Sequence, residues 1–229
     1  KGVFICPDLE ESLKVVALVM KEKKFGAAGN QLVIEEFLEG EEASFMVFSD
    51  GILAIPMVPS QDHKTAYDED KGPNTGGMGT YSSDSILSSQ ERQQVLDQII
   101  TPTIKGMAEG GHPYRGILYA GLMITSQGPK VLEFNVRLGD PETQVVLPRI
   151  KSDLLDIFQA MTAGSLSGSK IEWSKNATVC VVIASGGYPG SYTIGKEISG
   201  LDMVEEDSDT VVFHAGTSLK KAITITSGG

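Results

Sequence analysis

The stretch "VLEFNVRLGDPETQ", residues 131–144, combines an apolar strand with a row of polar side chains. Glu133, Asn135 and Arg137 recur at every second position, so they are expected on one face of the strand. Carboxylate and amide oxygens two residues apart suit Mg²⁺, and a guanidinium group suits phosphate or carboxylate. The stretch therefore predicts a strand that presents these groups to a cleft. The alternative is a solvated edge strand, although surface ion pairs stabilise little and the polar groups are dense for that purpose.

The residues Gly139, Asp140, Pro141 and Glu142 follow directly and predict a tight turn. This turn adds two carboxylates immediately after the strand. A carboxylate-rich turn next to a metal-binding strand is consistent with a site for phosphoryl transfer.

Working outward, the stretch "KGPNTGGMGTY", residues 71–81, contains four glycines. It is interpreted as part of a long loop, and two roles are open. Gly, Asn and Pro together are typical of a flexible surface turn, whereas glycines also allow backbone N–H groups to approach an anion. In the second role, valine at Gly76 or Gly77 is expected to weaken ligand binding and to change thermal stability little. Lys64, in "QDHK" at 61–64, would add a positive charge.

The stretch "VIEEFLEGEE", residues 33–42, reads as a strand that leads into a polar bend. Backbone groups of such a segment can read an adenine edge, and Glu41 or Glu42 can bind ribose hydroxyls. The alternative is a charged exit from a hairpin, which taken alone is the better interpretation.

The net charge and the lengths of the apolar runs argue against two classes of function. The chain has 229 residues, 41% of them hydrophobic, and a formal net charge of −11. This balance argues against a general nucleic-acid surface, which needs a basic face, and no apolar run is long enough to cross a membrane. The two cysteines, Cys6 and Cys180, read as buried thiols in a reducing compartment, so a cytoplasmic location is expected.

Local patterns predict helices and hairpins along the chain. Caps at Asp8, Ser88 and Ser152 predict helices, and Pro102 is expected to kink the second one. Asp50-Gly51 and Ser126–Gly128 predict hairpins. Further strands are expected over 3–6, 33–38, 177–183, 196–200, 210–216 and 222–226. The abrupt ends indicate a fragment.

Taken together, "GPNTGGMG", "LEFNVRLGDPE", "VIEEFLEGEEAS", "GILYAGLM" and "SGGYPG" resemble the glycinamide ribonucleotide synthetase family of ATP-grasp ligases, over nearly the whole chain. The resemblance implies an α+β ATP-grasp fold, partial here, in which two subdomains hold ATP. It implies the end of the lid subdomain over 1–38, the large catalytic subdomain over 39–168 and part of a small β-rich C-terminal domain over 169–229.

The resemblance also implies roles for single residues. Glu133 and Asn135 would hold Mg²⁺ or Mn²⁺, and Arg137, Asp140 and Lys64 would be catalytic. Two larger sets follow. ATP would be bound by Lys1, Glu35, Glu36, Phe37, Leu38, Glu42, Asn74, Thr75, Gly76 and Gly77. The substrates would be bound by Asp62, Lys64, Gly139, Asp140 and Glu142. Ala120 and Gly121 stand where many ATP-grasp proteins carry another acid.

The implied reaction joins glycine to 5-phosphoribosylamine at the expense of ATP, through glycyl phosphate, as a step of purine biosynthesis. Another ATP-grasp carboxylate–amine ligase, a biotin-carboxylase-like enzyme and a silent nucleotide-binding fragment are the alternatives. No nucleic-acid or membrane partner is expected, and fusion to other purine-pathway domains stays open. The fragment alone is expected to be inactive, because ATP would be open to water on one side.

Overall fold

The computed structural model describes residues 2–69 and 71–229, and the chain divides into two compact units, residues 1–39 and 40–229. The first unit contains α1 (Leu9–Val16), the π-helical η1 (Ala17–Lys21) and the 3-10 helix η2 (Gly26–Asn30). Asp8 caps α1 as predicted, because its side chain accepts a hydrogen bond from Glu11 N at 2.8 Å. The carboxylate of Glu11 pairs with Lys14 at 3.1 Å.

Two predicted strands of the first unit are wrong. Residues 3–6 and 33–38, all of them described by the structure, have no regular secondary structure. Val33 and Ile34 are more than four-fifths exposed. An apolar run forms a strand only when a neighbouring strand accepts its backbone hydrogen bonds, and these segments have no such neighbour among the described residues.

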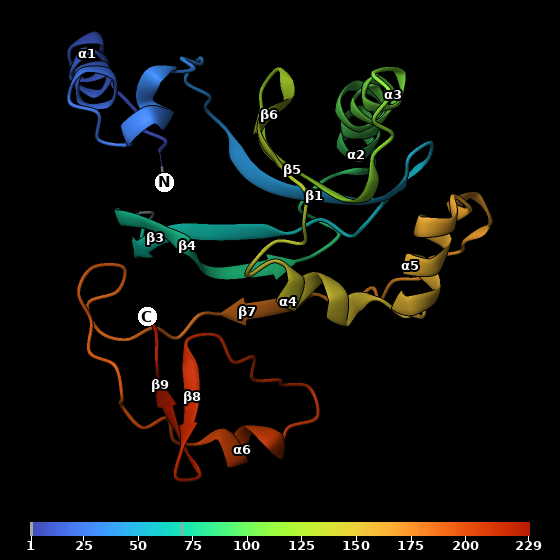
Figure 1. Ribbon diagram of the computed structural model, residues 1–229. Helices are drawn as coiled ribbons and strands as arrows, with labels where there is room; N and C mark the ends of the chain where they lie inside the picture. The colour runs from blue at the N-terminus through green and yellow to red at the C-terminus, as the bar shows by residue number, and fades with distance from the viewer. Residues whose placement is uncertain (1, 70) are drawn as a thin grey trace. The chain divides into compact units, whose positions relative to one another are not determined.

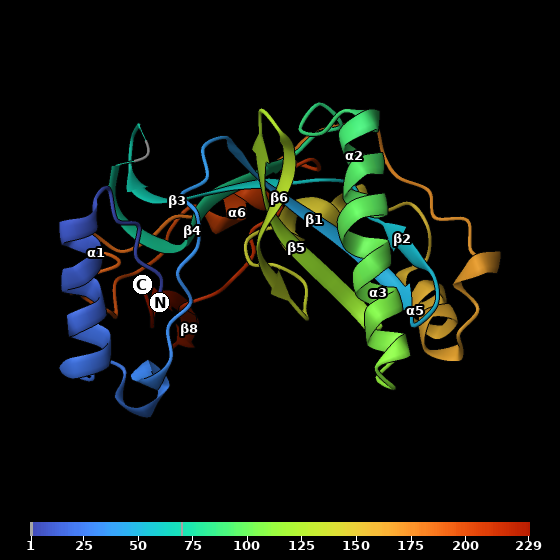
Figure 2. The same ribbon diagram turned by 90° about the horizontal axis from the view of Figure 1, so that it is seen from above.

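The second unit is built on a four-stranded antiparallel sheet with the order β2-β1-β5-β6. Figure 1 labels β1, β5 and β6, and Figure 2 labels all four strands. Its strands are β1 (Glu41–Asp50), β2 (Ala54–Pro56), β5 (Arg115–Thr125) and β6 (Gly128–Asn135). The hairpins predicted at Asp50-Gly51 and Ser126–Gly128 are confirmed, since they join β1 to β2 and β5 to β6.

Both faces of this sheet are covered in its middle. On one face, Phe45 and Val47 of β1 pack with Val95, Ile100 and other apolar residues of the long helix that crosses the sheet in Figure 2. On the opposite face, Met46 and Phe48 pack with residues that include Val145 and Val146. β1 is therefore buried on both sides, as its run of apolar residues indicates, and each fully buried side chain contributes about 1.5–3 kcal/mol.

The long helix consists of α2 (Ser89–Val95), η3 (Leu96–Ile100) and α3 (Thr101–Glu109). The capping box of Ser88 and Glu91 is confirmed. The π-helical turn η3 lies immediately before Pro102, where the missing N–H group interrupts the α-helical ladder. The third predicted helix is α5 (Leu154–Ala163), which ends at Gly164. Its cap is Asp153 rather than Ser152, whose hydroxyl instead accepts from Glu172 N at 2.8 Å.

The glycine-rich stretch is a strand, so the prediction of a long loop is wrong. β3 (Gln61–Tyr67) and β4 (Lys71–Ser82) form an antiparallel hairpin, and β7 (Thr178–Val181) pairs with β4 to complete a second sheet. The backbone at Gly72 and Gly77 has positive φ. Glycine permits this without strain, which is why a stretch typical of turns extends as an irregular strand.

Shorter elements follow the two sheets. α4 (Thr143–Val146) and the 3-10 turn η4 (Leu147–Arg149) come directly after the turn at 139–142, and the 3-10 turn η5 (Leu166–Gly168) follows α5. The C-terminal part contains α6 (Leu201–Glu205) and a hairpin of β8 (Thr217–Lys220) and β9 (Ile223–Thr226).

The prediction for β7 and for the last strand is confirmed, whereas no strand forms over 196–200 or 210–216, which the structure describes throughout. Cys6 and Cys180 are unpaired and only partly buried, so the prediction of two buried thiols is wrong. Among the described residues, no helix is both long and apolar enough to cross a membrane.

Candidate functional site

Glu133 and Asn135 of β6 lie on one face of the four-stranded sheet, as predicted. The third residue of that prediction, Arg137, lies beyond the end of β6. Asn135 pairs with Tyr119 of β5, and Glu133 pairs with Gly121 of the same strand. Residues that pair across two strands lie on the same face of the sheet. Glu42 and Ser44 of β1 have the same orientation by register. We call this face, which carries Glu42, Ser44, Tyr119, Glu133 and Asn135, the site face. Gly121 has no side chain on this face, and a Cβ added there would be in contact with Glu133 Cγ at 3.4 Å.

A β-bulge sets which side chains of β6 reach the site face. Gly121 pairs with Glu133 but Leu122 pairs with Val131, so Leu132 is an extra residue in β6. Val131 packs against the apolar core on the opposite face. Strict alternation would place Val131 and Glu133 on the same face, and the bulge allows one to enter the core while the other joins the site.

Lys64 of β3 is the cation of the site. Its ammonium group forms an ion pair with Glu42 and lies 3.7 Å from Asp62 Oδ1. Burial lowers the pKa of Lys64, but Glu42, Asp62 and Glu133 outweigh this effect and leave the pKa above its ordinary value. Lys64 is therefore a charged group that pairs with Glu42 of β1, lies beside Asp62 of β3 and is near enough to Glu133 of β6 for that charge to raise its pKa.

Asp62 is the buried carboxylate beside this lysine. Burial raises its pKa, Lys64 opposes the rise, and the charges of Glu142 and Glu42 add to it. A carboxylate that is desolvated and surrounded by like charges takes up a proton or a cation more readily than one in water. Asp62 thus marks a place where a further positive group would be favoured.

The turn at 139–142 reaches the same place. Glu142 is 3% exposed, and its Oε1 accepts hydrogen bonds from the Tyr119 hydroxyl and, at 3.3 Å, from the Ser44 hydroxyl. The other oxygen folds over Gly139, where any Cβ would collide with it. Glu142 is therefore enclosed by protein groups, whereas the resemblance implies that it binds substrate.

Thr75 and Gly77 of β4 make their contacts inside the protein. The hydroxyl of Thr75 donates to Lys64 O at 2.9 Å and accepts from Gly77 N at 3.0 Å. Gly77 lies flat against Pro141, since an added Cβ would collide with Pro141 Cδ and lie 3.8 Å from Asp62 Oδ2. The expectation that valine at Gly77 changes stability little is therefore wrong, whereas Gly76 has open space at the same position.

The remaining predicted site residues are spread over the chain. Arg137 lies beyond the end of β6, is exposed, and donates to the carbonyl oxygen of its neighbour Leu138 at 2.8 Å. Asp140 is exposed and accepts from Gln144 at 2.7 Å. Asn74 is exposed on β4. Residues 35–38 lie in the first unit, and Phe37 is 66% exposed. Lys1 lies outside the described residues.

Two donor groups on β6 fit a divalent cation. Glu133 Oε1 and the Asn135 amide lie 3.3 Å apart on the site face. The amide oxygen and nitrogen exchange places on a 180° rotation, so both residues can present oxygen, which Mg²⁺ and Mn²⁺ prefer. Among the described residues, no group of three or more His, Cys, Asp and Glu side chains has metal-binding geometry. Two side-chain donors leave positions for ligand phosphates.

Sequence reasoning did not identify Ser44 and Tyr119 as parts of this site. They lie 75 residues apart, and their hydroxyls are 2.7 Å apart in the fold. Only the register of β1 with β5 brings them together, and that register depends on the folded sheet. The signal available in the sequence was the spacing of Tyr119 within a predicted strand.

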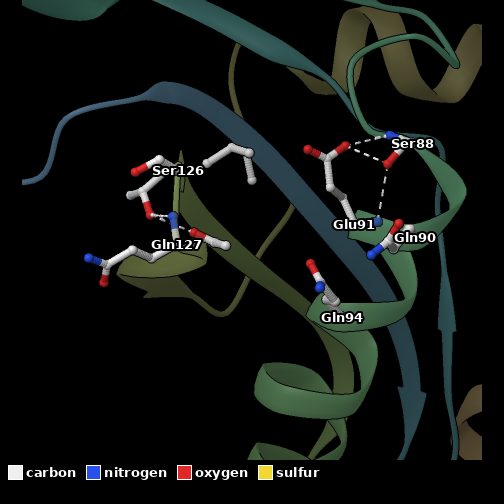
Figure 3. Close-up of a pocket in the computed structure, with 9 residues that line it drawn as sticks. Ser88, Gln90, Glu91, Gln94, Ser126 and Gln127 are labelled. Atoms are coloured by element: carbon white, nitrogen blue, oxygen red, sulfur yellow. Dashed lines mark hydrogen bonds between the residues drawn. The ribbon is translucent and has the colours of Figure 1, made fainter.

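A cavity of about 400 Å³ lies elsewhere, between the start of α2 and the β5–β6 turn (Figure 3). It is lined by Ser88, Gln90, Glu91, Gln94 and residues 124–128. Glu91 is engaged in capping α2 through Ser88 at 2.7 Å. Ile124 packs on the core opposite the site face, so this cavity is separate from the candidate site.

Two family models match the chain. They are "Phosphoribosylglycinamide synthetase, ATP-grasp (A) domain" over residues 1–143 and "Phosphoribosylglycinamide synthetase, C domain" over residues 178–229. The phosphoribosylamine–glycine ligase of Salmonella typhimurium is 52% identical, covering all of this chain and 54% of that protein. The trifunctional purine biosynthetic protein adenosine-3 of Gallus gallus is 50% identical, and the match covers 23% of it.

Solved structures agree with this assignment. The crystal structure of phosphoribosylamine–glycine ligase from Thermotoga maritima matches with a TM-score of 0.83 at 31% identity, over 100% of this chain and 56% of that one. A biotin carboxylase from Campylobacter jejuni matches 82% of this chain and 39% of its own with a TM-score of 0.55 at 15% identity, which indicates a shared fold alone.

The chain spans about half the length of the ligases that it matches. The A-domain match nevertheless covers more than half of the chain, and the observed α+β fold agrees with the one expected from the sequence. The chain therefore belongs to the phosphoribosylglycinamide synthetase family and carries its ATP-grasp and C domains.

Proposed function

We propose that this chain is the ATP-grasp and C-domain portion of a phosphoribosylamine–glycine ligase. The enzyme would join glycine to 5-phosphoribosylamine through glycyl phosphate and release ADP and phosphate. The observation that carries the proposal is the convergence of Lys64, Glu133 and the 139–142 turn on one side of the sheet. A cytoplasmic location follows from the proposal.

The charge and exposure of the site residues suggest a separate role for each of them. Glu133 and Asn135 would hold Mg²⁺ or Mn²⁺, which when bound shields the negative charge of the ATP phosphates. Arg137 is exposed next to that strand and presents a guanidinium suited to phosphate or carboxylate oxygens. Catalysis of this kind depends on positioning and charge stabilisation more than on a covalent nucleophile.

The substrates would bind on the side where Lys64 and Asp62 meet. Asp62 carries a raised pKa beside Lys64, so it favours a positive partner such as an amine. The exposed carboxylate of Asp140 and the backbone of Gly139 lie in the adjoining turn. Asn74 and Gly76 of β4 would face the phosphates, and Glu42 the ribose, with Thr75 and Gly77 shaping the strand.

Adenine would be read by the segment that contains Glu35, Glu36, Phe37 and Leu38. Its support is the irregular backbone of this segment and the exposure of Phe37, which offers an apolar surface for a base. Lys1 would contact phosphate by resemblance alone.

The test is Glu133→Ala in the full-length protein that carries this chain, with glycine, 5-phosphoribosylamine and Mg²⁺-ATP. Turnover should fall by about 100-fold or more, since metal-held phosphates lose their charge stabilisation, while the circular dichroism spectrum stays unchanged. Glu109→Ala is the matched control, because Glu109 is an exposed carboxylate at the end of α3 whose ion pair within the described part of the chain is with Lys105.

Wild-type protein that binds ATP but forms no glycinamide ribonucleotide would contradict the proposal. That outcome would favour a different carboxylate–amine ligase or a silent nucleotide-binding module. Equal activity of Glu133→Ala and wild type would contradict the assignment of the metal site while leaving the reaction in place.

A further inference from the structure

We infer that Ser44, Tyr119 and Glu142 form a positioning network that fixes the 139–142 turn against the site, and that Glu142 itself does not touch substrate. The inference rests on the proposed function and adds residues that the sequence did not identify. It reassigns Glu142 from substrate ligand to anchor of the turn.

The network joins three parts of the fold through one carboxylate oxygen. Tyr119 of β5 donates its hydroxyl hydrogen to Glu142 Oε1. The hydroxyl of Ser44, on β1, lies 3.3 Å from the same oxygen and 2.7 Å from the Tyr119 hydroxyl. The turn is thereby tied to two neighbouring strands of the sheet at a single point.

Burial makes this contact costly to disrupt. Ser44, Tyr119 and Glu142 are 2%, 6% and 3% exposed. The hydroxyls of Tyr119 and Ser44 donate hydrogen bonds to the Glu142 carboxylate inside the fold. Burying a carboxylate that is held by hydroxyl groups costs free energy that an apolar side chain would not cost. Its presence here is therefore better explained by what it positions than by stability.

The positioned groups are the neighbours of Glu142 in the turn. Its side chain folds over Gly139, where a Cβ would collide with it, and Pro141 packs against Gly77 of β4. Gly77 is in turn adjacent to Asp62, beside Lys64. A shift of Glu142 would therefore move Gly139 and Pro141 and change the wall around Asp62 and Lys64.

The experiment is steady-state kinetics of Tyr119→Phe, Glu142→Gln and the double variant in the full-length protein. Tyr119→Phe removes one hydroxyl and keeps the ring, so a loss reports the hydrogen bond. We expect kcat/KM for glycine to fall about 10- to 100-fold in each single variant, since small displacements of positioned groups cost this much. The KM for ATP should change less than threefold. The double variant should lose no more than the worse single variant, because residues that act as a unit are not additive.

Tyr114→Phe is the matched control. Its hydroxyl also donates a hydrogen bond, a partly buried one to Ile117 O at 2.6 Å, but its ring packs on the core opposite the site face. Tyr114→Phe should lower the melting temperature as Tyr119→Phe does and leave kcat/KM unchanged.

Three results would overturn the inference. If Glu142→Gln loses activity and Tyr119→Phe does not, Glu142 contacts substrate directly. If both variants lose melting temperature but keep kcat/KM per folded molecule, the network is only structural. If the losses of the two single variants add, the residues do not act together. A wild-type protein without ligase activity would instead reject the proposed function.

Discussion

Gly76 and Gly77 are neighbours in β4, but their surroundings differ. Gly77 has φ +131°, and a Cβ would collide with Pro141, whereas Gly76 has nothing within 4 Å of the same position. We predict that Gly77→Ala lowers the free energy of unfolding by about 1–3 kcal/mol, because it adds overpacking to backbone strain. Gly76→Ala should stay within about 0.5 kcal/mol of wild type.

Urea unfolding of both variants checks this pair. The midpoint should fall for Gly77→Ala only, with an unchanged slope. Equal midpoints for the two variants would contradict the contact between β4 and the 139–142 turn.

Asp50 gives a pH-dependent prediction at the same scale. Its carboxylate accepts from Leu53 N at 2.8 Å, Ile52 N at 3.0 Å and Leu166 N at 3.1 Å. Burial raises the pKa of Asp50, but these hydrogen bonds outweigh it and hold the pKa below its ordinary value of 3.8. Its stabilisation is therefore present above pH 3.8 and is lost as the pH falls through the folded-state pKa.

We predict that Asp50→Asn destabilises the fold by about 1–3 kcal/mol at neutral pH, since an amide cannot satisfy all three donors. The difference from wild type should shrink in unfolding curves measured at successively more acidic pH. Asp97→Asn is the control, because the hydrogen bond that Asp97 accepts, from the Gln93 side chain, is exposed. A difference for Asp50→Asn that is constant with pH would contradict the role of its charge.

At the scale of elements, Arg149 connects η4 to two other segments. Its guanidinium is 1% exposed and donates to Ser82 Oγ at 2.8 Å, Asp84 Oδ1 at 2.9 Å and Ser174 O at 2.9 Å. We predict that Arg149→Ala costs about 3 kcal/mol or more, because it leaves buried polar groups unpaired.

Arg92→Ala provides the comparison in chemical or thermal unfolding. Arg92 lies 3.7 Å from the same carboxylate of Asp84, but it is partly exposed. Its loss should cost less than about 1 kcal/mol. If the two substitutions lowered the free energy of unfolding by similar amounts, burial would not explain the stabilisation by Arg149.

Sequence patterns predicted the helix caps and hairpins that are formed by residues close together in the chain. The caps at Asp8 and Ser88 and the two hairpins of the main sheet depend on residues within a few positions of one another. The strand β4 was missed, because its glycines read as a turn and only its pairing with β3 and β7 makes it a strand. The opposite error at 33–38 has the same origin, because no strand that the structure describes pairs with this segment, and it stays irregular.

The candidate site divides in the same way. The shared face of Glu133 and Asn135 follows from period-two spacing and was predictable. The enclosure of Glu142 by Ser44 and Tyr119 was not, because it depends on hydroxyls contributed by strands 98 and 23 residues away in the chain. Long-range register therefore limits what the sequence reveals about such a network.

For the whole molecule, the two apolar cores lie entirely within residues 40–229. Their buried residues run from Ala43 to Leu166. We predict that a protein of residues 40–229 unfolds cooperatively with a urea midpoint equal to that of the whole chain, because burial of apolar surface dominates stability. A broad or shifted transition, measured by tryptophan fluorescence and circular dichroism together, would show that residues 1–39 contribute to the core.

The extra residue Leu132 in β6 also bears on how insertions and deletions are tolerated. With the bulge, Val131 enters the core and Glu133 joins the site face. Deleting Leu132 makes these two residues consecutive, so an ordinary strand would still send them to opposite sides. A single-residue insertion or deletion anywhere between Glu133 and Asn135 would instead place these two proposed metal ligands on opposite faces of the strand. Evolutionary length variation in this hairpin should therefore be confined to the bulge and the turn.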